Sequence, residues 1–303
     1  LAIIDFEAAV VNYSQWVGFY RAFPHFVDFT LFKNPRLVPH DLTLPQNLKP
    51  IFTSTQVLTN NTSIEQSQTV SFSTSTTTTS STAVTTGVKV GTKISDTLKE
   101  KVSVSIPFIG DGGAENSTTV EFTAEFNEST TDTKTNTEST TWSITQPVRV
   151  PPRKQVTAQL MIMGGTFYVP MDLFVNIAGN RGVWGTQLSP TQVAVMSDGG
   201  TSGVYINTTQ LSDTSWPGRP SQFRGLDSDG SLKFAGAAET QLATGIYATV
   251  KYTESDIRNP QADVRTWYAP YAFLQNGEQI DVSRVLPIGK PIVETKKAED
   301  ALQ

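Results

Sequence analysis

The side chains that most often perform acid–base or nucleophilic chemistry are scarce in this sequence. It holds two histidines, His25 and His40, and no cysteine. Both histidines lie in proline-bounded segments without a recognisable partner, which favours a structural or solvated role. The absence of cysteine excludes disulfides, thiolate metal sites and cysteine nucleophiles together. We therefore expect a protein that is not an enzyme and needs no cofactor.

One acidic cluster has the composition of a metal-binding loop. Asp227-Ser228-Asp229-Gly230 is similar to the start of a calcium loop, but the position for the distal glutamate is occupied by Ala238. We interpret the cluster as a β-turn and expect no metal site.

The charge balance narrows the choice of partners. Charged residues make up 17% of the chain and the net charge is -5, which argues against nucleic acid and against polybasic attraction to a membrane. No run of about 18 apolar residues occurs, so no transmembrane helix is expected. Any membrane contact must be apolar or led by a receptor.

Residues 98–126 have a pattern that would let a surface move from water into lipid. Two alternating segments flank Ile109-Gly110-Asp111-Gly112-Gly113, where the glycines can adopt positive φ in a turn. The apolar face comprises Val102, Val104, Ile106, Phe108, Val120, Phe122, Ala124 and Phe126. The polar face comprises Lys99, Lys101, Ser103, Ser105, Thr119, Glu121, Thr123 and Glu125. The pattern predicts an amphipathic β-hairpin.

The predicted hairpin has the dimensions of a membrane-spanning unit. Pairing Val104 with Val120 or with Phe122 keeps the faces intact, and the sequence does not choose between them. Each arm offers about ten residues, close to the 9–11 of a tilted transmembrane strand. Several copies closed into a barrel would place the polar face on a lumen and the apolar face in lipid. The alternative is an ordinary hairpin that covers a soluble core.

The flanking sequence favours insertion over that alternative. From Thr53 to Gln146 the chain contains 26 Thr and 15 Ser, with Pro107 as the only proline. β-Branched threonine favours long strands over a disordered polar tract, and Val70 to Val90 would span roughly 66 Å as one strand. Such neighbours would offer little apolar surface to receive the hairpin. We expect an elongated molecule.

The remaining segments suggest a head and further strands. Ala8, Val11, Trp16, Phe19 and Phe23 recur at near-helical spacing and predict one or two short N-terminal helices. The Gly-rich stretch 172–236 suggests a loop-rich cap, and residues 293–303 suggest a tail. Strand-like runs are Val156–Met163, Ile246–Tyr252 and Val264–Tyr268.

Two further sets of residues are weaker candidates. Exposed aromatic clusters mark binding surfaces, and the candidates for receptor binding are Trp16, Phe19, Tyr20, Phe23, Trp184, Tyr205 and Trp216. Most aromatic residues at near-helical spacing are core residues, so core packing is the favoured alternative for these positions. The candidates for activation cleavage are Lys290, Lys296 and Lys297.

Four segments resemble a known family: Pro39–Leu48, Thr55–Ser73, Lys93–Gly113 and Gln146–Val156. They are similar to the epsilon-toxin/mosquitocidal-toxin branch of the aerolysin-type β-pore-forming toxins, and most similar to its insecticidal crystal-protein members. The resemblance covers roughly residues 36–175, and Tyr247–Leu274 more loosely.

The resemblance implies a mostly β, elongated fold of long twisted antiparallel strands, with a small head that carries short N-terminal helices. It also implies a protoxin that is secreted or deposited in a bacterial crystal or with the spore. Such a protoxin is trimmed by proteases and binds a protein or glycan receptor on a target-cell membrane. It then inserts as a homo-oligomer, typically of about seven protomers. Nucleic acid is not expected as a partner.

These observations give a division of the chain and a leading function. Residues 1–48 with about 172–236 would form the receptor-binding head, and 49–97, 127–171 and 237–290 the elongated oligomerisation sheet. Residues 98–126 would be the insertion hairpin, and 291–303 a tail removed on activation. The leading hypothesis is an insecticidal pore-forming toxin. The alternative is a secreted β-sandwich adhesin or lectin without pore activity.

Overall fold

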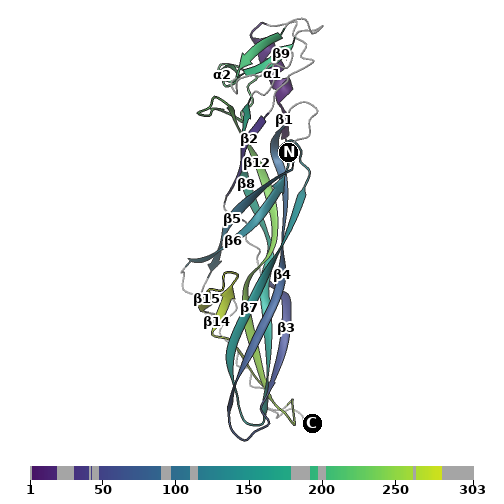
Figure 1. Ribbon diagram of the computed structural model, residues 1–303, viewed down its shortest axis with the longest axis vertical. Coiled ribbons are helices and arrows are strands. Elements are labelled where there is room, and N and C mark those ends of the chain that lie inside the picture. Colours follow the sequence, from purple (N-terminus) through teal and green to yellow (C-terminus); the bar gives the residue numbers. More distant parts are fainter. Residues whose placement is uncertain are drawn as a thin grey trace, which may run out of the picture.

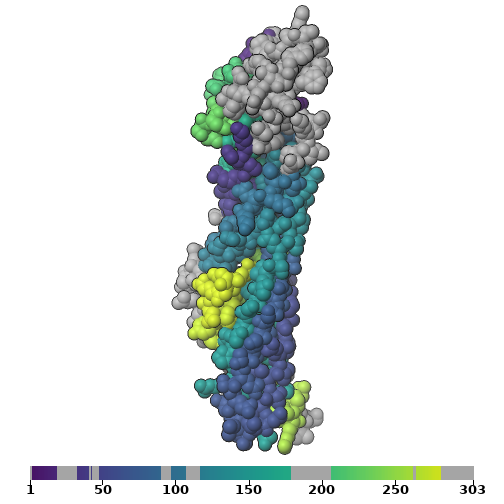
Figure 2. All heavy atoms as spheres, viewed as in Figure 1, coloured from purple at the N-terminus to yellow at the C-terminus, as the bar shows by residue number. Residues whose placement is uncertain are grey.

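The computed structural model describes residues 2–18, 31–40, 42, 48–89, 97–109, 115–178, 192–196, 203–261 and 264–281. Within these ranges the protein is elongated and mostly β, with its strands along the long axis and its short helices at one end (Figure 1). The space-filling view has the same narrow outline (Figure 2). The predicted fold class is confirmed.

Three long strands set the length of the body. β4 (Gln66–Lys89) has 24 residues, and β8 (Lys154–Ala178) and β12 (Leu232–Asp256) have 25 each. At about 3.3 Å per residue each spans roughly 80 Å. β4 confirms the single strand predicted from the Ser/Thr tract, where threonine favours extended backbone and no proline interrupts it. β12 pairs with β8 along its whole length.

Shorter strands extend this central pair into a sheet that has 11 strands within the described residues. β1 runs parallel to β4, whereas the others pair antiparallel. They are β1 (Ala2–Asp5), β2 (Leu31–Pro39), β3 (Lys49–Thr59), β7 (Lys134–Val150), β11 (Phe223–Leu226), β13 (Arg265–Tyr268), β14 (Tyr271–Leu274) and β15 (Gln279–Asp281). The strand-like runs expected after residue 147 are therefore strands.

A bulge divides the body into two halves. The register of β12 against β8 shifts between Gly245 and Tyr247, where Gly164 of β8 faces Gly245. A Cβ on Gly164 would lie 2.3 Å from the carbonyl oxygen of Thr244, so only glycine fits.

The two halves of β8 serve different cores. Even-numbered residues before the bulge contribute to one core, and odd-numbered residues after it contribute to a second. Side chains alternate along a strand, so the two cores lie on opposite faces of β8. The first set is Val156, Ala158, Leu160 and Ile162. The second is Phe167, Val169, Met171 and Leu173.

The head contains α1 (Phe6–Trp16), α2 (Thr208–Leu211) and a two-stranded sheet of β9 (Gln192–Met196) and β10 (Gly203–Asn207). α1 confirms an N-terminal helix, and its first turn is capped by Asp5, which accepts from the Ala8 amide at 3.1 Å. Its buried apolar residues are Phe6, Ala9, Val10 and Tyr13, and not the set Ala8, Val11 and Trp16 whose spacing indicated the helix.

The reason is the position of the head core. Phe6 packs on Phe223 with ring centroids 5.7 Å apart, and Tyr13 meets Trp216 edge-on at 5.3 Å. These partners follow far later in the chain and select the other side of the helix.

The stretch 172–236 is also more regular than a loop-rich cap, because it includes the ends of β8 and β12. Both strands run without a break across the expected division between head and sheet.

Candidate membrane-insertion hairpin

The predicted hairpin consists of β5 (Leu98–Ile109) and β6 (Glu115–Phe126). Val104 lies opposite Val120, and Val102 lies opposite Phe122. Of the two registers that the sequence allowed, the structure has the first. The turn residues 110–113 lie outside the described residues.

The odd-numbered face of the hairpin is polar and directed to solvent. Thr123 and Glu125 are half-buried, and the other predicted polar residues are exposed. Lys99 Nζ lies 3.1 Å from Glu125 Oε2 on the paired strand, and Ser103 Oγ donates to Glu121 Oε1 at 3.5 Å. The charges on this face are therefore partly matched within the hairpin.

The apolar side chains of the even-numbered face are covered between Val102 and Phe126. Those described in this range are no more than 3% exposed: Val102, Val104, Ile106, Val120, Phe122, Ala124 and Phe126. The side chains of Phe108 and Ile109 lie outside the described residues. The hairpin thus presents a largely apolar surface to the body, in which Glu100 and Thr118 are the polar members among the described side chains.

The surface beneath the hairpin is apolar, which corrects the expectation that Ser/Thr-rich neighbours would receive it. The sequence argument considered the strands that flank the hairpin in the chain, whereas the sheet places β8 and β12 below it. The hairpin runs along the body toward β14 and β15 (Figure 1). Its buried partners from these strands are Phe167, Val169, Met171, Leu173, Ala238, Leu242, Ile246, Tyr247, Ala272 and Leu274.

This burial makes free release into water very unfavourable. Six valine, isoleucine and phenylalanine side chains of the hairpin are buried, and each contributes about 1.5–3 kcal/mol, or about 9–18 kcal/mol together. Since 1.4 kcal/mol changes an equilibrium tenfold, the exposed state would be very rare. Departure of the hairpin must be coupled to burial of the same face elsewhere.

The edges of the hairpin are joined to the body by side chains. Within the described residues, β5 and β6 form a sheet of their own. At Thr123 of β6, the carbonyl oxygen accepts from Ser80 Oγ at 2.6 Å, and the amide donates to Glu138 Oε1 at 3.1 Å. Asn136 Nδ2 donates to the same carboxylate oxygen at 3.0 Å. Ser80 belongs to β4, and Glu138 and Asn136 belong to β7.

The opposite edge has a similar contact through Glu100 of β5. Burial raises the pKa of Glu100 above its ordinary value of 4.5, although the amide hydrogen bond from Leu37 and the nearby charge of Arg36 act to lower it. The docked hairpin therefore favours the protonated carboxyl relative to a fully solvated one.

A tight turn fixes the base of the hairpin. The amide and hydroxyl of Ser129 both donate to Asn127 Oδ1, at 2.8 and 2.6 Å. The Val88 amide donates to the Glu128 carbonyl at 2.9 Å. A Cβ on Gly87 would lie 2.1 Å from that carbonyl oxygen, so glycine is needed for β4 to approach this turn.

The separation into a polar and an inward face continues from the hairpin into β4 and β7. Gln66 lies opposite Val150 and Thr82 lies opposite Lys134, so even-numbered residues pair with even-numbered ones in this ladder too. Its odd-numbered residues point outward, and their hydroxyls meet across the strands, with Ser75 Oγ 3.2 Å from Thr141 Oγ1. One polar face therefore follows both ladders.

The inward face of β4 carries hydroxyl groups near the hairpin base. Thr78 Oγ1 lies 2.8 Å from Thr244 Oγ1, and Thr82 Oγ1 lies 2.7 Å from Thr240 Oγ1. All four threonines are buried. Their mutual hydrogen bonds offset the desolvation that burial imposes.

The predicted receptor-binding residues have different environments. Trp16 is 42% exposed at the end of α1, whereas Trp216 is 2% exposed and donates from Nε1 to Asn12 Oδ1 at 2.9 Å. The burial of Trp216 makes it a core residue of the head and corrects its selection as a surface contact. Phe19, Tyr20, Phe23 and Trp184 lie outside the described residues, as does the side chain of Tyr205.

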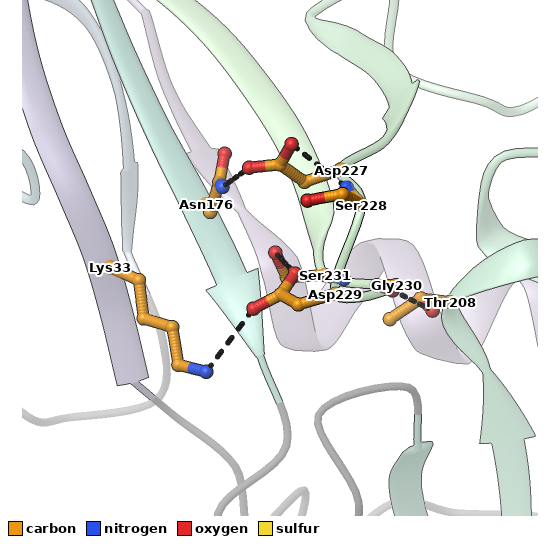
Figure 3. Close-up of polar contacts among 8 residues, drawn as sticks. All are labelled: Lys33, Asn176, Thr208, Asp227, Ser228, Asp229, Gly230 and Ser231. Atoms are coloured by element: carbon orange, nitrogen blue, oxygen red, sulfur yellow. Dashed lines mark hydrogen bonds and ion pairs between the residues drawn. The ribbon is translucent and has the colours of Figure 1, made fainter.

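The acidic cluster 227–230 is a turn between β11 and β12, as predicted (Figure 3). The Gly230 amide donates to the Asp227 carbonyl at 2.9 Å. Asp229 accepts from the Ser231 amide and lies 3.4 Å from Lys33 Nζ, while Asp227 accepts from Asn176. Hydrogen bonds, above all from the Ser228 amide to Asp227 and from the Ser231 hydroxyl to Asp229, hold the pKa of both carboxyl groups below its usual range. The carboxylates thus join the turn to β2 and β8.

Other kinds of site were sought across the described parts of the chain. They contain no group of three or more His, Cys, Asp or Glu that could hold a metal ion. No helix among them has the length and apolarity needed to cross a membrane. His40 lies 3.0 Å from Asp172 on the body surface. Lys290, Lys296 and Lys297 lie outside the described residues.

Comparison with known proteins agrees with the geometry of the hairpin. The family model for Clostridium epsilon toxin ETX and Bacillus mosquitocidal toxin MTX2 matches residues 10–266. The chain belongs to this family. The resemblance seen in the sequence is confirmed, and the ETX/MTX2 family is one of pore-forming toxins.

Individual members support the assignment. Pesticidal crystal protein Cry15Aa of Bacillus thuringiensis subsp. thompsoni is 35% identical over 152 residues, which are 47% of this chain and 42% of that protein. The chain thus spans less than half of this relative. The structure of Cry23Aa1 in its binary complex with Cry37Aa1 has a TM-score of 0.56 and 26% identity, and the match covers 91% of this chain and 99% of that one.

A second structure is informative about the fold alone. A non-toxic crystal protein from Bacillus thuringiensis has a TM-score of 0.61 at 16% identity, over 84% of this chain and 98% of that one. Because a protein described as non-toxic shares the fold, the fold does not decide activity. A proposal about the activity of this ETX/MTX2 protein must therefore rest on its hairpin and not on the fold.

Proposed function

We propose that the protein is a non-enzymatic, insecticidal pore-forming toxin whose β5–β6 hairpin leaves the body and enters a target-cell membrane. The observation that carries this proposal is the hairpin itself. It has one apolar and one polar face, and backbone hydrogen bonds join its two strands to each other but not to the main sheet. It can therefore move as a unit.

The dimensions and chemistry of the hairpin support insertion as a barrel. Each strand has 12 residues, enough for the 9–11 that a tilted transmembrane strand requires. Lipid would replace β8 and β12 as the partner of the apolar face. The polar face would line a water-filled lumen, with Lys99, Lys101, Glu121 and Glu125 near its wide end. Pairing between copies would satisfy the strand edges.

The remaining steps follow from the family and from the earlier predictions. The head would bind a protein or glycan receptor, with Trp16 as an exposed candidate, and a ring of about seven protomers would form. Deposition as a crystal or spore-associated protoxin, and trimming near Lys290, Lys296 or Lys297, belong to the same proposal. No step requires a metal, a cofactor or nucleic acid.

Single-cysteine labelling tests the proposal, because the chain contains no cysteine of its own. An environment-sensitive dye is placed in turn at Val104, Phe122, Ser103 and Ser105, and protease-treated protein is added to phosphatidylcholine vesicles. Quenchers in the lipid should reach the dye at the two even positions, and an aqueous quencher should reach it at the two odd ones. If the vesicles release their contents but quenching does not alternate in this way, the hairpin is ruled out as the spanning unit.

The alternative, a secreted adhesin or lectin, is supported by the shared fold of the non-toxic crystal protein. An adhesin would bind target membranes without releasing vesicle contents, and its hairpin would stay against β8 and β12. Binding without release, in protease-treated protein at every concentration that gives surface attachment, would select this alternative.

A further inference from the structure

Two carboxylates break the alternation that otherwise separates polar from inward residues. In β5 and β7 the even-numbered positions carry the inward face, yet Glu100 and Glu138 have even numbers. Between Lys134 and Arg149, Glu138 is the only charged residue of β7. Glu138 of β7 lies beside the β6 edge of the hairpin, and Glu100 lies within β5 at its other edge.

The contact at Thr123 has the form of a strand pairing made by side chains. In an antiparallel strand, the N–H and C=O of one residue point to the same side. For Thr123 both groups point to the body, where Ser80 Oγ donates to the oxygen at 2.6 Å and Glu138 Oε1 accepts from the nitrogen at 3.1 Å. Two side chains from different strands therefore replace a neighbouring strand at this point.

We propose that Glu138 and Ser80 form a latch that holds the edge of β6 and sets how readily the hairpin leaves the body. The proposal rests on the proposed function, since it concerns the same hairpin. A backbone ladder would have to be broken residue by residue, whereas the hydrogen bonds that the described residues show between this edge and the body meet at one residue. Asn136 Nδ2, at 3.0 Å from Glu138 Oε1, keeps the carboxylate in place. Glu100 makes the corresponding contact to the Leu37 amide at the other edge.

The test compares Glu138→Ala, Glu138→Gln and Ser80→Ala in the full chain. Hydrogen exchange at the Thr123 amide reports edge opening in the soluble protein, and the rate of dye release from phosphatidylcholine vesicles reports insertion. Loss of a charge-assisted hydrogen bond should speed both about tenfold in Glu138→Ala. Glu138→Gln keeps an acceptor oxygen for Thr123, so it should change them less than about threefold. Exchange in β8 and β12 should stay unchanged in all variants.

Glu65→Ala is the matched control, because Glu65 is also exposed and lies 3.8 Å from Arg149, away from the hairpin. If the Thr123 amide exchanges at the same rate in Glu138→Ala as in Glu65→Ala, the latch proposal is overturned. Faster exchange at Thr123 and throughout β8 and β12 alike would also overturn it, since that result means global destabilisation. If no variant releases dye, the proposed function fails, but exchange at Thr123 still decides the latch.

Discussion

The two ladders β4–β7 and β5–β6 follow one pattern and are attached to the molecule in different ways. Both pair even with even residues and expose the odd ones. β4 also forms backbone pairs with β12 from Thr79 to Thr86, which makes its ladder part of the main sheet. β5–β6 has no such connection among the described residues, and only side chains join it to the body. The comparison shows that sequence pattern sets the faces of a hairpin, while its attachment sets whether it can move.

The largest expected effect comes from equivalent truncations in the two ladders. Phe72→Ala in β4 should lower the free energy of unfolding of the whole molecule by about 3–5 kcal/mol, because a buried phenylalanine is lost from the integrated sheet. Phe122→Ala in β6 should weaken hairpin docking by a similar amount and leave the main unfolding transition almost unchanged. Thermal unfolding and protease sensitivity of residues 98–126 measure the two effects. Equal shifts of the main transition would remove the distinction.

The junction between the two ladders depends on Gly87. In Gly87→Ala the new methyl group would meet the Glu128 carbonyl oxygen, 2.1 Å away, and displace it from the Val88 amide. We expect a loss of about 1–3 kcal/mol in the free energy of unfolding, with faster hydrogen exchange at Val88. In Gly225→Ala nothing lies within 4 Å of the new methyl group, so any loss of stability there comes from the positive φ of 93° and should leave exchange at Val88 unchanged.

The buried hydroxyls of β4 provide a smaller test of its attachment. Replacing Thr82 or Thr240 alone by valine should destabilise the protein by about 1–3 kcal/mol, since the buried hydroxyl that remains loses its partner across the two strands. The double replacement should recover much of that loss. A double-mutant cycle by chemical denaturation measures the coupling. Strict additivity of the two changes would show that this pair does not stabilise the contact between β4 and β12.

The smallest expected effect is a pH dependence of stability that has opposite signs in the hairpin and in the head. The raised pKa of Glu100 means that its contribution to docking is complete below the ordinary value of 4.5 and is lost as pH rises through the raised value. The lowered pKa of Asp227 gives the opposite sign, with stability present above 3.8 and lost as pH falls through the lowered value. Exchange rates of β5 and of the 227–231 turn between pH 3 and 7 measure both. Glu100→Gln should abolish the first trend.

Much of this comparison could be predicted from sequence because it is local. Alternation gave the two faces of the hairpin, and threonine with a lack of proline gave the length of β4. The surface beneath the hairpin could not be predicted, because β8 and β12 are distant in the chain and their pairing is not encoded in any one segment. The buried side of α1 could not be predicted for the same reason, since Phe223 and Trp216 decide it. Glu138 was missed, although a lone charge with inward parity was a visible signal.

A reversible cross-link tests the central claim, departure of the hairpin from the body. Cysteines replace Thr123 in β6 and Glu138 in β7, whose amide and carboxylate are 3.1 Å apart, and a reducible bifunctional thiol reagent joins them. The chain has no other cysteine to compete. The account predicts no dye release from vesicles while the bridge is intact, full release after reduction, and release from each single-cysteine variant given the same reagent. Undiminished release from the bridged protein would contradict it.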